Sequence, residues 1–183
     1  MDKQTEEILQ KIEEAEYVLV GLGQEFDMEF FLQSREDYRR IREQLQQQNV
    51  LWLLPYVEEQ FRRQYLPEME AEIEKGLQKL AKVLEKKSYF VVSSSLNHKL
   101  AEVPWKKMLL KKERFVAPCG DWTKKQCPDG CEEGIQTVTE ADEEQLQESF
   151  KKLQTNGFSV PDLGKCPKCG KKLVLNNVYA GRY

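Results

Sequence analysis

The sequence has no long hydrophobic run and no excess of basic residues. No apolar segment among its 183 residues approaches the length of a membrane-spanning helix, and the formal net charge is −3 at pH 7. The first seven residues are polar and acidic, whereas a secretory signal is basic and then apolar. We therefore expect a cytoplasmic protein without a membrane partner. We do not expect nucleic acid as a partner, because the charge gives no general attraction to it.

Histidine is almost missing, since His98 is the only one in the chain. Imidazole titrates near neutral pH and could act as a general base, but a lone histidine more often lies at the surface or packs in a loop. The scarcity also matters for Cys119, which has no histidine near it in the sequence to activate its thiol. Cys119 could be a nucleophile, a spare metal ligand or an inert, partly buried thiol, and we favour the inert thiol.

Cysteine, by contrast, is concentrated in two short motifs that we call knuckles. The first is Cys127-Pro128-Asp129-Gly130-Cys131 and the second is Cys166-Pro167-Lys168-Cys169-Gly170. Four thiolates in two pairs are a usual ligand set of structural Zn²⁺, which needs four soft ligands at tetrahedral positions. Unrelated thiols or a disulfide are the alternative, but no signal peptide points to an oxidising compartment. The sequence therefore predicts one zinc ion bound by Cys127, Cys131, Cys166 and Cys169.

The distribution of apolar residues predicts an α/β chain. It indicates a helix at 3–15, strands at 17–20, 89–92 and 114–117, and a helical block at 27–87 that Pro55 and Pro67 divide. The runs at 17–20 and 89–92 are continuously apolar, which is typical of strands buried on both faces. Strands separated by helices pair in parallel. We therefore expect these two runs to pair in a parallel sheet, with the helical block above the carboxyl ends of the strands.

Two further patterns indicate structure rather than function. Helical spacing favours a core over a substrate groove for a set of aromatic residues, namely Trp52, Tyr56, Phe61, Tyr65, Trp105 and Trp122. Between the knuckles, the acidic stretch that begins at Thr139 indicates a helix with that residue as N-cap and acids in its first turn.

The order of these elements resembles that of the sirtuins, which are NAD-dependent deacylases and ADP-ribosyltransferases. Residues 17–23 are similar to the family's first strand and Gly-Ala-Gly loop, and residues 88–98 are similar to its strand and Thr-x-Asn-x-Asp loop. Cys119-Gly120-Asp121-Trp122 lies where the family has its His-Gly segment, and the knuckles follow in the position of the family's zinc module. The similarity is closest to the microbial macrodomain-linked sirtuins, in which Gly-Asp-Tyr-Gly precedes a Gln-Cys-x-x-x-Cys knuckle.

The resemblance implies a truncated Rossmann-like, sirtuin-type parallel sheet with a helical block over residues 1–118. It implies a zinc-ribbon module with a helical insertion over residues 119–183. NAD or ADP-ribose is the ligand that the resemblance implies, held at Gly21, Gly23 and Ser93. The hydroxyls of Ser93 to Ser95 suit a ribose or phosphate, but they equally suit a loop that satisfies its own backbone.

At three positions that align with functional residues of the family, this chain carries a different residue. Ser95 aligns with the catalytic asparagine, Asn97 with the aspartate that follows it, and Cys119 with the catalytic histidine. The 183 residues also end before the Gly-Thr-Ser segment that completes NAD binding in the family. NAD ribose chemistry needs a positioned asparagine and a base, and these positions offer neither. We therefore expect weak or absent catalysis by this chain alone.

A different class of function is a non-catalytic zinc-ribbon module that binds a protein partner through the ribbon or the aromatic helices. Lysines surround the second knuckle and could contact phosphates, but a solvated face is commoner for such residues; they are Lys165, Lys168, Lys171 and Lys172. NAD or ADP-ribose should stabilise a sirtuin-like protein and leave an interaction module unchanged.

Overall fold

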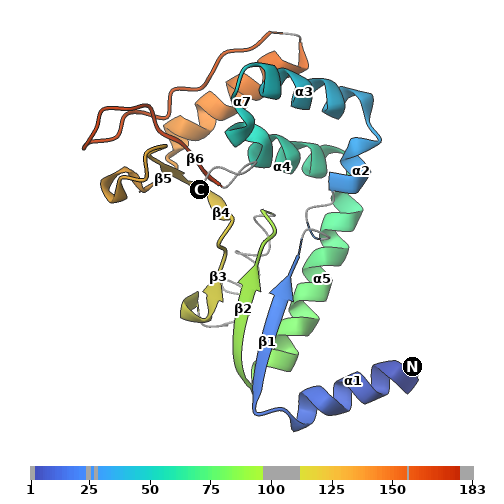
Figure 1. Ribbon diagram of the computed structural model, residues 1–183. Coiled ribbons are helices and arrows are strands. Elements are labelled where there is room, and N and C mark those ends of the chain that lie inside the picture. Colours follow the sequence, from blue (N-terminus) through green and yellow to red (C-terminus); the bar gives the residue numbers. More distant parts are fainter. Residues whose placement is uncertain (1–2, 24–25, 27–28, 97–111, 156, 178–183) are drawn as a thin grey trace.

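The computed structural model is a mixed α/β fold with two three-stranded sheets (Figure 1). It describes residues 3–23, 26, 29–96, 112–155 and 157–177. Up to residue 96 the chain forms α1 (Lys3–Glu14), β1 (Tyr17–Leu22), α2 (Glu29–Gln33), α3 (Glu36–Gln47), η2 (Leu51–Leu53), α4 (Leu54–Tyr65), α5 (Pro67–Leu84) and β2 (Ser88–Ser93). From residue 112 onward it forms η3 (Lys112–Arg114), β3 (Phe115–Val116), β4 (Gly120–Gln126), η4 (Glu132–Gly134), β5 (Gln136–Thr137), α7 (Glu140–Gln154) and β6 (Val174–Asn177).

The first sheet is parallel and has the order β1-β2-β3. Tyr17 pairs with Ser88 at one end of β1, and Leu22 pairs with Ser93 at the other. The predicted parallel pairing of 17–20 with 89–92 is confirmed, and helices between Glu29 and Leu84 connect these two strands. The expectation that the whole helical block lies above the carboxyl ends of the strands is wrong for α5, which packs along a face of the sheet (Figure 1). The third strand is shorter than predicted, because only Phe115 and Val116 pair with β2.

Helix α5 covers one face of this sheet. The resulting sheet core consists of Leu22, Leu77, Ala81, Leu84, Tyr89 and Val91, with Val18, Val20 and Phe115 packed against it. The other face is open: Tyr17 and Leu19 are 74% and 75% exposed, and Phe90 and Val116 are about half as exposed. The expectation that both apolar runs are buried on both faces is therefore wrong, because the described helices cover a single face of the sheet (Figure 1).

The helical block breaks where the sequence predicts. Pro55 lies in the first turn of α4 and Pro67 begins α5, which are positions where proline removes no intrahelical hydrogen bond. Helix α3 ends at Gln47, and Asn49 just beyond it has a φ of 56°, in the left-handed region. Val50 N donates to Leu45 O at 2.9 Å and Asn49 N donates to Gln46 O at 3.0 Å, which is the Schellman arrangement. This turn directs the chain from α3 into α4.

Helices α2 to α4 pack against the second sheet and α7. The resulting helix–knuckle core contains Leu32, Tyr38, Ile41, Leu45, Val50, Leu53, Leu54, Tyr56, Val57, Phe61, Trp122, Cys127, Leu146, Leu153, Leu163, Cys166, Leu173 and Leu175. Tyr56 meets Trp122 edge to face at 5.5 Å between ring centroids. A core role is confirmed for Tyr56, Phe61 and Trp122, while Trp52 and Tyr65 pack against that core and Trp105 lies outside the described residues. The division at 118/119 stays a prediction, and this core spans it.

Charged residues are buried inside the helical block. Arg62, 1% exposed, lies 3.0 Å from Glu59 through Nη2 and 3.2 Å from Glu70 through Nε. Tyr38 donates its hydroxyl to Glu58 at 2.7 Å. Burial alone would raise the pKa of Glu59, but the charges of Arg62 and Arg63 outweigh it and hold the pKa below its ordinary value. Arg62 is thus paired with two carboxylates in the core, while Glu58 accepts a hydrogen bond from a neutral hydroxyl.

Candidate metal centre

The four cysteines of the two knuckles converge in one cluster that could hold a metal ion. The sulfur atoms of Cys127, Cys131, Cys166 and Cys169 all lie within 4.8 Å of one another, and Cys127 Sγ is 3.4 Å from Cys169 Sγ. Around a tetrahedral zinc ion with bonds of about 2.3 Å, neighbouring sulfurs are about 3.8 Å apart. The spacing in the cluster is therefore close to what a single ion requires.

Each knuckle is a tight turn that presents its two thiols on the same side. The first follows β4, and the second is closed by an isolated bridge between Lys165 and Lys172. Gly130 N donates to Cys127 O at 3.0 Å, and Gly170 N donates to Cys166 O at 2.9 Å. Gly170 has a φ of 73°, as its place after the last cysteine predicts. The extra residue of the first knuckle does not prevent the same kind of turn.

Gly134 lets the chain pass close to the first cysteine. A Cβ atom at this position would lie 2.5 Å from Cys127 Cβ, which is closer than real Cβ atoms come. Its N–H donates to Cys131 O at 2.9 Å, so η4 folds back over the knuckle. No sequence pattern indicates this role, because the glycine lies outside both cysteine motifs.

The electrostatics of the cluster favour one thiolate without an ion. Burial opposes ionisation of Cys127, but the N–H groups of Asp129 and Cys131 and the neighbouring thiols lower its pKa to about 7. Burial and then the neighbouring thiols raise the pKa of Cys131 to about 12. Cys169 also has a raised pKa, despite the N–H of Lys171, because Cys127 and burial disfavour a second negative charge. A bound divalent cation would remove this conflict and allow all four thiols to ionise.

Two exposed ion pairs connect the first knuckle and η4 to the second knuckle and the residue that follows it. Lys171 Nζ is 2.7 Å from Asp129 Oδ2, and Lys168 Nζ is 3.4 Å from Glu133 Oε1. The pKa of Lys171 is raised by its hydrogen bond to Asp129. All four lysines around the second knuckle are exposed, which agrees with the solvated face that we favoured for them.

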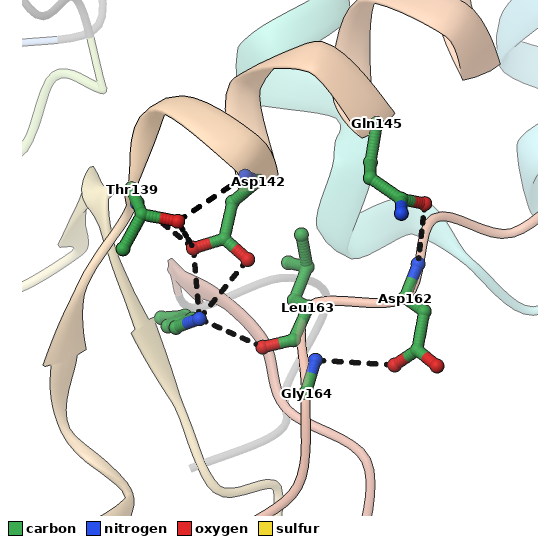
Figure 2. Close-up of polar contacts among 7 residues, drawn as sticks. Thr139, Asp142, Gln145, Asp162, Leu163 and Gly164 are labelled. Carbon is green, nitrogen blue, oxygen red and sulfur yellow. Dashed lines mark hydrogen bonds and ion pairs between the residues drawn. The ribbon is translucent and has the colours of Figure 1, made fainter.

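A buried ion pair joins β4 to α7 and to the segment before the second knuckle (Figure 2). Lys125 Nζ donates to both carboxylate oxygens of Asp142, at 3.0 and 2.8 Å, and to Leu163 O at 2.9 Å. Asp142 also accepts from the N–H and the hydroxyl of Thr139, both at 2.8 Å, while its own N–H donates to Thr139 Oγ1. The predicted N-cap is thereby confirmed as a full capping box. Burial would raise the pKa of Asp142, but Lys125 and Thr139 lower it.

The positions assigned to a cofactor by the sirtuin resemblance meet at the carboxyl ends of β1 and β2. Ser94 N donates to Leu22 O at 2.9 Å, which ties the two loops together. Ser93 is fully buried with its hydroxyl 3.5 Å from Ser95 O, whereas Gly21 is exposed and Gly23 is partly exposed. The serine loop thus satisfies part of its own backbone, in line with the structural interpretation of these hydroxyls.

The aligned catalytic positions are only partly described. Ser95 is 4% exposed, and Asn97 and His98 lie outside the described residues. Cys119 is half-buried between β3 and β4, and it does not belong to the four-sulfur cluster found among the described residues. The structure therefore brings the glycine and serine loops together but gives no geometry for a complete catalytic set.

No protein-family model matches the sequence, and no curated protein matches it at a significant level. The sirtuin resemblance therefore stays a prediction. What the structure shows is an α/β fold with a parallel sheet and a four-cysteine cluster that could hold a metal ion. No helix in the described part of the chain is long and apolar enough to cross a membrane.

Proposed function

We propose that the protein is a sirtuin-like zinc protein in which Cys127, Cys131, Cys166 and Cys169 bind one structural Zn²⁺. The observation that carries the zinc assignment is the convergence of four sulfurs from two turns. Four protein thiolates complete a tetrahedral shell and leave no open position for substrate, so the ion stabilises the fold and does no chemistry. Cys127 and Cys166 are 2% exposed and belong to the helix–knuckle core, so the ion would stabilise that core directly.

Metal analysis of reduced protein tests this proposal. We expect one zinc ion per wild-type chain, loss of the ion in Cys166→Ser, and full retention in the matched variant Cys119→Ser. Substitution with Co²⁺ should give the intense visible absorption of tetrahedral thiolate coordination. A wild-type protein without bound zinc, or loss of zinc in Cys119→Ser, would refute the assignment.

We also propose that the parallel sheet is a partial Rossmann-like core that binds NAD or ADP-ribose at the carboxyl ends of β1 and β2. Ligands of open α/β sheets bind beyond the carboxyl ends of the strands, where glycines let backbone N–H groups approach a pyrophosphate. The contact between Ser94 and Leu22 places the serine loop beside the end of β1 at Gly21-Leu22-Gly23, which supports this site. Ser95 and Cys119 in place of the family's asparagine and histidine support binding with little turnover.

The variant Gly21→Ala gives a sharp test of the ligand site. A Cβ at position 21 meets no atom within 4 Å, so the variant should fold as the wild type does. We expect ADP-ribose to raise the melting temperature of the wild type, and we expect a smaller rise in Gly21→Ala because the methyl group occupies space that the pyrophosphate needs. Equal shifts in both proteins would place the ligand elsewhere, and no shift in either would reject the proposal.

Turnover is tested separately by nicotinamide release from NAD with an acylated or lipoylated protein substrate. We expect no appreciable release, because each missing positioned acid or base lowers a rate by about 10²–10⁴-fold. Robust release that Cys119→Ala abolishes would contradict this and would identify Cys119 as a catalytic thiol.

The open face of the sheet favours a second candidate, a protein-interaction module. Tyr17, Leu19 and Phe90 expose apolar surface on a parallel sheet, a kind of sheet that is normally covered on both faces. In this case ADP-ribose should leave the melting temperature unchanged, while Leu19→Thr should weaken binding of whatever covers the face.

A further inference from the structure

We infer that Lys125 is a positioning residue for the metal centre, one that holds the two knuckles together before the ion binds. This inference rests on the proposed zinc site and concerns how that site is formed. It implies that the chain offers a largely assembled set of ligands, so that the ion can leave and return without unfolding the helix–knuckle core.

The position of Lys125 in the chain makes such a role possible. It lies on β4 two residues before Cys127, and its acceptor Leu163 O lies three residues before Cys166. These two segments are 38 residues apart in sequence. The third contact, Asp142, belongs to the first turn of α7, the helix that connects the knuckles. One ammonium group therefore joins both cysteine-bearing segments to the helix between them.

The contacts of Lys125 leave its ammonium no spare donor. Its three N–H bonds match the three acceptors, which are the two oxygens of Asp142 and the carbonyl of Leu163 (Figure 2). Lys125 is 7% and Asp142 is 6% exposed, so water does not compete strongly for either group. Removal of one partner would leave a charge in the core without compensation, which is strongly destabilising. We call Lys125, Asp142 and Leu163 the buried node. Its contacts thus hold these three residues in one arrangement.

The surface pair of Lys171 and Asp129 provides a natural comparison. It also connects the two knuckles, but both side chains are about half exposed. Exposed pairs contribute little, because water and salt screen them. If the knuckles are held together without the ion, the buried node and the packing around it have to hold them, and the surface pairs do not suffice.

The experiment compares Lys125→Met with Lys171→Met in the full chain under reducing conditions. Zinc affinity is measured by competition with a chromogenic chelator, and hydrogen exchange is measured with and without zinc. We expect the metal-free wild type to retain exchange protection in β4 and β6. We expect Lys125→Met to lose that protection without zinc, to regain it with zinc, and to bind zinc about 10- to 100-fold more weakly. Lys171→Met should change the affinity by less than about fivefold.

Two further variants keep the outcome interpretable. Asp142→Asn keeps the shape of the node and removes its negative charge, so it should weaken zinc binding in the same direction even if Lys125→Met does not fold. Leu84→Ala removes a buried side chain of the sheet core, and its zinc affinity should equal that of the wild type although its stability falls. A similar loss of affinity in Leu84→Ala would mean that general destabilisation explains the effect, which would overturn the inference.

The results also separate this inference from the proposal beneath it. A wild-type chain that binds no zinc rejects the zinc proposal itself. A wild-type chain that binds zinc but loses all protection in β4 and β6 when the ion is removed rejects only the positioning role. Equal zinc affinities for Lys125→Met and Lys171→Met would reject that role as well.

Discussion

The helix–knuckle core and the sheet core differ in how completely they are enclosed. The first is surrounded by α3, α4, α7 and the second sheet, and even its charged residues, such as Arg62, are buried and paired. The second has α5 on one face and exposed tyrosine, leucine and phenylalanine side chains on the other. The chain thus stabilises the surroundings of the cysteine cluster far more thoroughly than its parallel sheet. Substitutions should therefore have unequal effects in the two regions.

The largest difference is expected for one pair of phenylalanines. Phe61 is 1% exposed and packs its ring against Tyr38, Tyr65 and Phe150 at centroid distances of 5.5, 5.7 and 5.9 Å. Phe61→Ala should lower the free energy of unfolding by about 3–5 kcal/mol. Phe90→Ala, on the open sheet face, should lower it by less than about 1 kcal/mol. Urea denaturation of both variants measures this difference, and equal losses would show that the sheet face is covered in solution.

The buried charges permit a second comparison within one helix. Arg62 and Arg63 both contact Glu59, but Arg62 is buried whereas the side chain of Arg63 is 56% exposed. Arg62→Met should destabilise the protein by about 3–5 kcal/mol, because Glu59 and Glu70 would lose their buried partner. Arg63→Met should change stability by less than about 1 kcal/mol. Thermal and urea unfolding give both values. If Arg62→Met leaves the stability unchanged, then Glu59 and Glu70 are protonated or reach water in the folded variant.

The lowered pKa of Glu59 predicts a loss of stability in acid. Because the pKa is lower in the folded state than the ordinary 4.5, the unfolded chain binds the proton more readily. The contribution is complete above about pH 4.5 and is lost as the pH falls through the folded-state value. Unfolding free energies measured between pH 7 and pH 3 should show this decline, and Glu59→Gln should make it shallower. An unchanged slope in that variant would assign the decline to other carboxylates.

The smallest effect on stability is expected at the open face. Leu19 is 75% exposed, so Leu19→Thr should change the free energy of unfolding by no more than about 0.5 kcal/mol. The same change should reduce concentration-dependent association, because it removes apolar surface from the face. Light scattering over a range of protein concentrations measures that association. A large loss of stability would instead indicate that Leu19 packs against another group.

The sequence predicted the elements whose signal is local. The apolar runs at 17–20 and 89–92 gave the parallel pairing, and the spacing of the cysteines indicated which thiols converge. Thr139 as N-cap was also correct, since an N-cap depends on the residues that follow it directly. Local patterns of this kind need no knowledge of the packing between elements.

The sequence did not predict which side chains the packing between elements would bury or leave exposed. Glu59 and Arg62 have the composition of an exposed helix face, yet α4 runs through the core and buries them. Lys125 alternates with polar neighbours on β4, and nothing near it indicates that Asp142 will neutralise it. The open sheet face was missed for the opposite reason: an apolar run indicates two faces that favour burial, but it does not show whether the chain supplies a cover for each.

The connection between β1 and β2 has a consequence for the rate of folding. Leu22 and Ser94 are hydrogen-bonded although they are 72 residues apart, and most of the helical block lies between them. Closing so long a loop has an entropic cost that precedes any gain from pairing, so contacts of this kind form slowly. We expect α3 and α4, which are adjacent in sequence, to associate early and the parallel strands to register late. During that interval the apolar faces of β1 and β2 are unpaired, and refolding at high protein concentration should favour aggregation through these strands.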